Sequence, residues 1–274
     1  MTASDVQCNG AGFVRSNQRE ADLMTSHSVL DGAEPFLLEG SSTGILISHG
    51  YTGSTQSVRY VAEQLHRIGG YTVLGPRLAG HGVSPQEMDR TRAQDWVDSI
   101  DEALGTLRQR CARIFMMGLS MGGCLTLLSA ARHPDIAAIV PINACVYFGA
   151  PSLAAKAYDR SAPRFFDSIG ADIKAEGVTE LAYDEIPTST LAEIYGLMSV
   201  ARDLLPEIKC PALVLQSTED HVVPPDNGNV IVDGIGSDDK TLIWLENSYH
   251  VATLDNDKDR IVELAHRFFE RLPQ

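Results

Sequence analysis

Six short and uniformly apolar segments alternate along this chain with segments whose apolar residues recur every three to four positions. Segments of the first kind, bounded by Gly, Pro or Asn, are typical of strands that are buried on both faces. They lie at 44–48, 71–74, 113–117, 136–142, 212–216 and 241–245. Segments of the second kind are typical of amphipathic helices, with clear examples at 58–68, 96–107 and 261–269. The alternation predicts an α/β fold in which helices cover both faces of a mostly parallel sheet.

One interruption of this alternation predicts an insertion. Residues 147–207 separate two predicted strands that a single helix would ordinarily connect. Apolar residues broken by Gly and Pro predict short amphipathic helices there. We therefore expect residues 31–146 and 208–274 to form the core, residues 147–207 to form a small helical cap, and the polar residues 1–30 to form a lead-in. The alternative for 147–207 is an outer helix layer without a role in access to the core.

The charge balance argues against two classes of partner. Asp and Glu outnumber Lys and Arg by 36 to 22, so the formal net charge is −14 at pH 7. Because this charge repels phosphate backbones and anionic lipids, we expect no nucleic-acid partner. The longest apolar segment, 136–150, is too short to span a bilayer and contains Pro141 and Asn143. We also expect no stable membrane insertion.

The cysteines argue against a metal centre and against a disulfide framework. The five cysteines are odd in number, scattered, and without a Cys-x-x-Cys pair. Free cysteines in apolar segments are typical of a reducing compartment. The N-terminal residues contain no uninterrupted apolar segment of signal-peptide length. We therefore expect a cytoplasmic protein.

A Gly-x-Ser-x-Gly pattern at residues 118–122 predicts a nucleophilic serine. It directly follows the predicted strand 113–117 and directly precedes a predicted helix. This strand, turn and helix arrangement holds a serine in a sharp turn, where flanking glycines leave room for the backbone. Ser120 would then lie at a helix N-terminus, where free N–H groups stabilise negative charge.

A serine hydroxyl needs a general base and a carboxylate that orients this base. Asp220 and His250 each follow a predicted strand, and polar groups in such sheets gather at the carboxyl ends of the strands. The chain order Ser120, Asp220, His250 is the order of an α/β-hydrolase triad. Glu219 is the alternative orienting carboxylate, and Asp203 and Asp255 are weaker candidates because no predicted strand precedes them. His221 adjoins Asp220 in the sequence, so its side chain is expected to point away from it.

The backbone N–H groups of Tyr51 and Met121 are the candidate oxyanion-hole donors. Such a hole uses the residue after the nucleophile and a loop that follows an early strand. Met121 follows Ser120, and Tyr51 lies in the glycine-containing loop after strand 44–48. A second glycine-rich loop, residues 77–82, is interpreted as bracing the site rather than taking part in catalysis.

With these residues, the chain resembles the α/β-hydrolase superfamily, and within it the bacterial carboxylesterase and monoacylglycerol lipase family. The resemblance spans residues 45–272. It rests on segments 48–53, 75–82 with Trp96, 118–123, 220–224 and 248–251. Tyr51 departs from the family pattern, which usually has a small residue or phenylalanine at this position. The N-terminal forty residues exceed the usual lead-in, and the cap sequence matches nothing specific.

The resemblance implies a mobile cap over an apolar tunnel, and hydrolysis of short to medium acyl esters or monoacylglycerols. It also implies that Val222 lines the substrate pocket. Tyr147, Phe148, Phe165 and Phe166 are expected on the underside of the cap, with an interface between copies as the alternative.

The combined hypothesis is a serine ester hydrolase whose partner is a small-molecule ester and which uses no cofactor and no metal. The same triad would also suit a lactonase, a thioesterase or a hydrolase of aromatic-diacid monoesters. A noncatalytic ligand receptor on the same fold is a further alternative, because fold does not imply function.

Overall fold

A seven-stranded sheet forms the centre of the structure, a computed structural model that describes residues 28–168 and 170–273. In spatial order its strands are β1 (Phe36–Leu38), β3 (Thr72–Gly75), β2 (Thr43–Ser48), β4 (Arg113–Leu119), β5 (Ile136–Ile142), β8 (Ala212–Ser217) and β9 (Lys240–Leu245). β1 is antiparallel to β3, and the other neighbouring pairs are parallel. The predicted mostly parallel sheet is confirmed. The sequence did not predict β1, because a strand of three residues at a sheet edge has too short a pattern to recognise.

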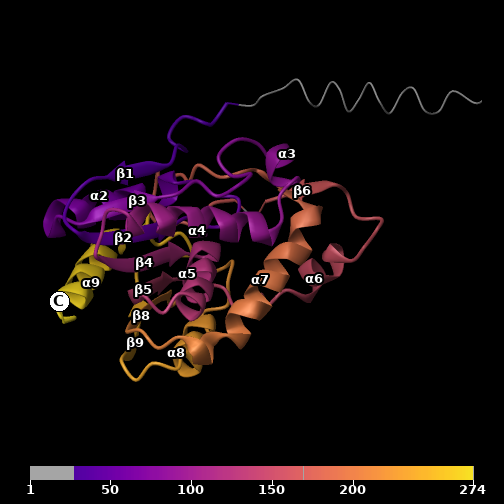
Figure 1. The fold of residues 1–274 in the computed structure, drawn as a ribbon. Helices are drawn as coiled ribbons and strands as arrows, with labels where there is room; N and C mark the ends of the chain where they lie inside the picture. The colour runs from indigo at the N-terminus through magenta and orange to yellow at the C-terminus, as the bar shows by residue number, and fades with distance from the viewer. Residues whose placement is uncertain (1–27, 169, 274) are drawn as a thin grey trace, which may run out of the picture.

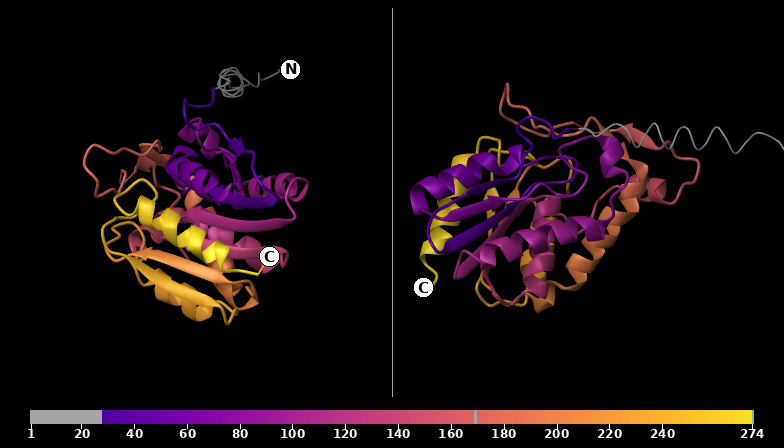
Figure 2. Two further views of the ribbon diagram at one scale, coloured as in Figure 1. Left: turned by 90° about the vertical axis from the view of Figure 1, so that its left-hand side faces the viewer. Right: turned by 45° about the horizontal axis from the view of Figure 1, so that its top comes forward.

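Helices cover both faces of this sheet (Figure 1, Figure 2). On one face, α2 (Gln56–Gly69) packs against α9 (Lys258–Glu270). The other face carries α4 (Ala93–Arg108), which follows the short α3 (Pro85–Met88), together with α5 (Met121–Arg132) and α8 (Asn227–Gly234). Side chains of adjacent strand residues point to opposite faces of the sheet. Phe115 therefore packs against the α2/α9 side, and Met116 packs against the α4/α5 side. This two-sided burial explains why the strands are uniformly apolar.

The chain order of the strands creates the position for a site. β2 lies between β3 and β4. After β2 the chain enters α2 on one face, and after β4 it enters α5 on the opposite face. The two loops therefore diverge, and such a divergence at the carboxyl ends of parallel strands leaves a crevice in which ligands bind.

Residues 147–207 are here called the cap segment, and their described part contains two α-helices, two short 3₁₀ helices and a separate two-stranded sheet. The elements are α6 (Pro151–Ala157), β6 (Phe165–Asp167), β7 (Glu185–Pro187), η1 (Thr188–Thr190), α7 (Leu191–Asp203) and η2 (Leu205–Glu207). The sequence predicted only helices here. It missed β6 and β7 because each has three residues and they pair across a long connection. α7 contacts α4 and α5, β7 contacts α3, and η2 contacts α5 and α8, whereas α6 contacts α7 and η1. The cap segment is therefore joined to the core through several of its elements.

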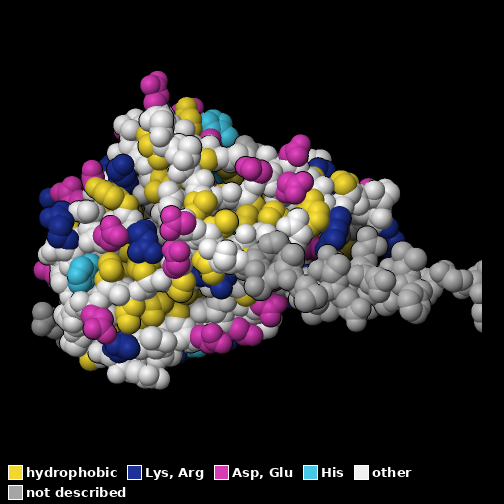
Figure 3. Space-filling view, turned by 90° about the horizontal axis from the view of Figure 1, so that it is seen from above, with side chains coloured by type: hydrophobic (Ala, Val, Ile, Leu, Met, Phe, Trp, Pro, Cys, Tyr) yellow, Lys and Arg dark blue, Asp and Glu magenta, His cyan; other side chains and the backbone are white. Residues whose placement is uncertain are grey.

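The predicted lead-in falls largely outside the described residues, since 1–27 are not among them. Of the part that is described, Leu30 donates a backbone hydrogen bond to the carbonyl oxygen of Gly82. Within 28–168 and 170–273, no helix is both long enough and apolar enough to cross a membrane. Acidic side chains are spread over the face seen in Figure 3 rather than gathered in one patch.

Candidate active site

Ser120 lies at a sharp turn between β4 and α5. Its backbone has φ 55° and ψ −117°, a strained conformation that few non-glycine residues adopt. The neighbouring glycines make the turn possible, because a Cβ on Gly118 would lie 2.1 Å from the carbonyl oxygen of Gly122. A Cβ on Gly122 would lie 2.3 Å from the carbonyl oxygen of Ser48. The strand, turn and helix around Ser120 are therefore those that the glycine pattern predicts.

His250 and Asp220 meet across two loops that follow neighbouring strands. His250 Nδ1 lies 2.8 Å from Asp220 Oδ2, and the Asp220 side chain is fully buried. Asp220 Oδ1 accepts the backbone N–H groups of Val222 and Val223, at 3.0 and 2.8 Å. With Nδ1 donating to Asp220, the Nε2 atom of His250 is left to accept a proton.

The surroundings of His250 change its basicity. Burial disfavours the charged imidazolium and lowers the pKa of His250, but the neighbouring acidic groups, the carboxylate of Asp220 first among them, together outweigh this effect. The pKa of His250 is therefore raised above its ordinary value. A histidine with such a partner is suited to take a proton and then to return it.

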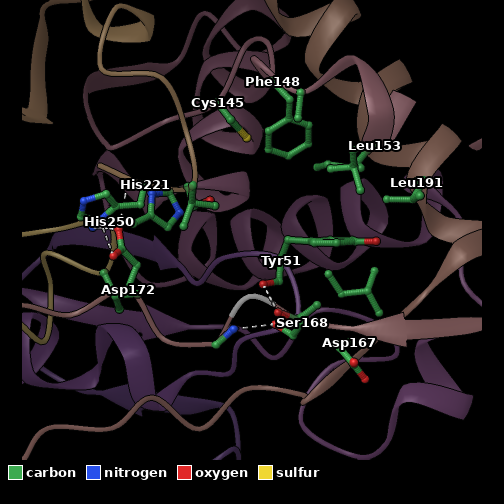
Figure 4. A pocket seen from close by; sticks show the side chains of 18 of the residues that line it. Tyr51, Cys145, Phe148, Leu153, Asp167, Ser168, Asp172, Leu191, His221 and His250 are labelled. Carbon is green, nitrogen blue, oxygen red and sulfur yellow. Dashed lines mark hydrogen bonds and ion pairs between the residues drawn. The ribbon is translucent and has the colours of Figure 1, made fainter. Parts of the chain in front are cut away.

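Ser120 and His250 both line a cavity of about 250 Å³ between the sheet edge and the cap segment (Figure 4). The core contributes loop residues to its wall, among them Tyr51, Cys145 and Val222. The cap segment contributes mainly apolar side chains, namely Phe148, Ala150, Leu153, Phe166, Ile186, Leu191 and Ile194. Val222 lines this cavity from the core side, and Phe148 and Phe166 line it from the cap side.

The loop after β2 passes beside Ser120. A Cβ on Gly50 would lie 3.3 Å from the Cβ of Ser120 and 3.8 Å from its Oγ. Tyr51 is the next residue, and its N–H belongs to the same piece of backbone. Met121 is the first residue of α5, so its N–H has no acceptor within the helix. Both candidate oxyanion donors therefore belong to backbone that adjoins the serine.

The side chain of Tyr51 connects this loop to the cap segment. Its hydroxyl is hydrogen-bonded to the hydroxyl of Thr190, which in turn donates to the carbonyl oxygen of Pro187 at 2.8 Å. The ring packs edge-on against Trp96, with centroids 6.0 Å apart. Burial raises the pKa of Tyr51, so the phenol stays protonated. The departure from the family pattern at position 51 thus adds a polar bond between the core and the start of α7.

The loop 77–82 lies next to the loop that follows β2 and contains Tyr51. His49 Nε2 accepts the backbone N–H of Leu78 at 3.2 Å, and its Nδ1 bonds the carbonyl oxygen of Gly50 at 3.0 Å. The ring of His81 lies 5.1 Å from that of His49 between centroids. Burial lowers the pKa of His49 to about 4 and that of His81 to about 3, so both rings are neutral at pH 7. These contacts support the interpretation of the loop as a brace.

The rival candidates for the triad have other partners. His221 lines the same cavity as His250, but its Nδ1 atom bonds Asp172 Oδ1 at 2.7 Å. Glu219 pairs with Lys174 at 3.4 Å. Asp255 is buried, and its carboxylate accepts the backbone N–H groups of Lys174, Ala175, Tyr249 and Asn256. Asp203 is the exposed last residue of α7.

Two residues that hold the triad loops were not predicted from the sequence. Asn143, just after β5, donates to the carbonyl oxygen of His250 at 2.7 Å and accepts the N–H of Ser217 at 2.7 Å. Its φ of 42° is unusual for a non-glycine residue. Asp172, in the cap segment, accepts the N–H of His250 at 3.1 Å. One sequence feature could have pointed to Asn143, because it is a polar residue directly after an apolar strand, at the same sheet edge as Ser120. Asp172 belongs to no recognisable sequence pattern.

Neither a metal site nor a disulfide occurs in the part of the chain that the structure describes. There, no group of three or more His, Cys, Asp or Glu side chains could hold a metal ion. The four cysteines within it, Cys111, Cys124, Cys145 and Cys210, have free thiols. Cys8 lies outside the described residues.

Comparisons with known proteins found a matching family and several similar proteins. A model of the family described as serine aminopeptidase, S33, matches residues 41–257. The thermostable monoacylglycerol lipase of Bacillus sp. (strain H-257) is 49% identical over 91% of this chain and 99% of its own length. The carboxylesterase of Bacillus subtilis (strain 168) is 30% identical over 87% of this chain and 97% of its own. A solved structure from a study of the metagenome-derived lipolytic enzymes LipS and LipT is 52% identical, with a TM-score of 0.88, over 89% of this chain and 100% of its own.

Proposed function

Because this chain belongs to the α/β-hydrolase family described as serine aminopeptidase, S33, we propose that it is a serine hydrolase that cleaves carboxylic esters through an acyl-enzyme. Its similarity to a monoacylglycerol lipase and to a carboxylesterase supports an ester, rather than a peptide, as substrate. The observation that carries the proposal is the 2.8 Å bond between His250 and Asp220 beside a cavity that Ser120 also lines.

In the proposed mechanism, Ser120 Oγ attacks the ester carbonyl while His250 Nε2 takes its proton. The N–H groups of Tyr51 and Met121 hold the oxyanion of the tetrahedral intermediate. When this intermediate collapses, His250 gives the proton to the leaving alcohol. Water then repeats these steps on the acyl-enzyme, which releases the acid and restores the serine. Asp220 holds the imidazole in the required tautomer throughout.

We propose monoacylglycerols and similar neutral monoesters of medium chain length as the substrates. The cap side of the cavity is apolar and suits an acyl chain. Among the described residues, its lining includes the carboxyl groups of Asp167, Asp172 and Glu180 and no Lys or Arg. These groups favour an uncharged alcohol such as glycerol over a substrate that carries its own carboxylate, such as a monoester of an aromatic diacid. The same triad would act on lactones and thioesters, so the assay must include them.

The residues 147–207 are proposed to form the cap over this cavity, with 31–146 and 208–274 as the catalytic core. The cytoplasmic location stays a prediction.

Replacement of Ser120 by alanine tests the proposed function. We expect Ser120→Ala to lose turnover by a factor on the order of 10⁶, since the covalent step needs the hydroxyl. Initial rates would be measured for monoacylglycerols of several chain lengths, p-nitrophenyl esters, lactones, thioesters and aromatic-diacid monoesters. An unchanged unfolding midpoint would show that the variant is folded. Equal turnover by parent and variant would refute the assignment of Ser120.

A further inference from the structure

Asp172 of the cap segment joins the two loops that carry His250 and Asp220 (Figure 4). Its Oδ2 atom accepts the backbone N–H of His221 at 3.0 Å and the backbone N–H of His250 at 3.1 Å. Its Oδ1 atom bonds the Nδ1 atom of His221 at 2.7 Å. His221 directly follows Asp220 in the chain. One carboxylate thus holds the backbone of both loops.

This bridge acts on the bond that orients the proposed catalytic base. The 2.8 Å contact between His250 and Asp220 joins residues on different loops, so its length and angle depend on how the loops are spaced. Asn143 holds the carbonyl oxygen of His250 from the side of the sheet, at 2.7 Å. Asp172 holds the N–H of the same residue from the side of the cap. The backbone of His250 is therefore fixed at both of its polar groups by side chains from outside its own loop.

The environment keeps Asp172 charged. Its side chain is 14% exposed. Burial alone would raise the pKa of Asp172, but the hydrogen bonds from His221 and His250 outweigh burial and lower it. A charged acceptor makes stronger hydrogen bonds than a neutral one.

Asp172 lies in a part of the cap segment that is bonded to the core. Its own carbonyl oxygen accepts the N–H of Val251 at 3.1 Å. The carboxylate of Asp255 accepts the N–H groups of Lys174 and Ala175, at 2.7 and 2.9 Å. Further along the chain, the N–H of Tyr183 donates to the carbonyl oxygen of Thr52, in the loop after β2, at 3.0 Å. We call residues 172–183 the inner segment. Its bonds make it a fixed part of the site, in contrast to α6.

We propose that Asp172 is a positioning residue that holds the His250 and Asp220 loops at the spacing catalysis needs. The inference rests on the proposed function. It gives the cap segment a role in positioning the catalytic loops, in addition to its proposed role of covering the cavity.

Separate rates for acylation and for hydrolysis of the acyl-enzyme can distinguish a positioning role of Asp172 from a role in substrate binding. With a p-nitrophenyl ester, the burst of nitrophenol reports acylation, and the following steady state reports hydrolysis of the acyl-enzyme. The alcohol has left before the second step, whereas His250 serves both steps. We expect Asp172→Ala to slow both steps by a similar factor, about tenfold to a hundredfold, with a smaller change in KM. Asp172→Asn keeps one acceptor oxygen and should recover part of the loss.

Asp184→Asn is the matched control. Asp184 is an exposed carboxylate of the cap segment that does not line the cavity, and among the described residues its side chain forms no hydrogen bond with either loop. It should leave both steps within about twofold of the parent, well below the effect expected from lost positioning. If Asp172→Ala slowed acylation by a monoacylglycerol but left hydrolysis of the acyl-enzyme unchanged, Asp172 would be a substrate-binding residue and the inference would be wrong. Unchanged rates in both steps would also overturn it.

A second measurement needs no substrate. The proton on His250 Nδ1, shared with Asp220, gives a low-field ¹H NMR signal when the bond is held and protected from water. We expect a sharp signal in the parent and in Asp184→Asn, and a signal broadened by exchange in Asp172→Ala. An equally sharp signal in Asp172→Ala would contradict the inference. If the parent hydrolysed no ester, the proposed function would fail, whereas this signal would still decide whether Asp172 holds His250.

Discussion

The two walls of the cavity are built in different ways. On the core wall, the polar groups beside Ser120 are held by directional bonds, such as those from Asp220 and Asn143 to His250. On the cap wall, apolar side chains such as Phe148 and Leu191 line the cavity without directional bonds. Hydrogen bonds fix angles, whereas apolar contacts mainly exclude water. We therefore expect the core wall to determine the chemistry, and the cap wall to determine the size and shape of the substrate.

Residues of the inner segment belong to the cap segment in sequence, but in structure they belong to the core wall. Asp172 and Tyr183 come from the cap segment, yet their bonds resemble those of the core wall. Changes on the core wall should alter kcat, and changes on the apolar cap wall should alter KM and chain-length preference. Each of the following predictions tests this difference between the two walls.

Among these three predictions, the largest effect is expected from Asp220→Asn. The amide would favour the wrong tautomer of His250, and we expect kcat to fall by a factor on the order of 10⁴ with a small change in KM. Glu219→Gln is the matched control, because Glu219 is the neighbouring carboxylate and pairs with Lys174 instead. Steady-state kinetics on one p-nitrophenyl ester would measure both variants. A larger loss in Glu219→Gln than in Asp220→Asn would reverse the assignment of the orienting carboxylate.

A second prediction concerns pH. His250 must be neutral to accept the proton of Ser120, and its pKa is raised above its ordinary value because Asp220, together with Cys145 and Glu180, outweighs the effect of burial. The value of kcat/KM should therefore fall about tenfold per pH unit as the pH drops below this raised pKa. In Asp220→Asn the acid limb should move to lower pH, since the carboxylate that stabilises the imidazolium is gone. An acid limb that stays in place in this variant would mean that another group controls it.

The smallest effect is expected on the cap wall. Phe148 lines the cavity and packs edge-on against Tyr195, with centroids 5.4 Å apart. Phe148→Ala removes apolar surface from the acyl chain, so we expect KM for the longest chains to rise about tenfold and kcat to stay within about twofold. Tyr158→Ala is the control, since Tyr158 is 83% exposed and belongs to the same segment. A large fall in kcat for Phe148→Ala would place this residue with the core wall.

Local patterns were sufficient to predict the sheet and the candidate triad. Uniform apolarity marked the strands, and Asp220 and His250 stood directly after two of them. The same patterns missed β1, β6 and β7, whose three residues each are too short to show a period. They also missed the two bonds that hold the backbone of His250. These bonds join residues 78 and 107 positions apart, to Asp172 and Asn143 respectively. No local pattern records which distant side chain reaches a given N–H or carbonyl group.

The sequence by itself determined the fold class, the order of the candidate triad, and the edge of the sheet at which Ser120, Asp220 and His250 lie. It could do so because strand and helix patterns depend on burial within a few neighbouring residues, and parallel strands bring their carboxyl ends together. The tertiary structure decided which carboxylate faces His250, which cap residues brace the loops, and how large the cavity is. Those features depend on how separate loops pack against one another. That packing is set by contacts between residues far apart in the chain.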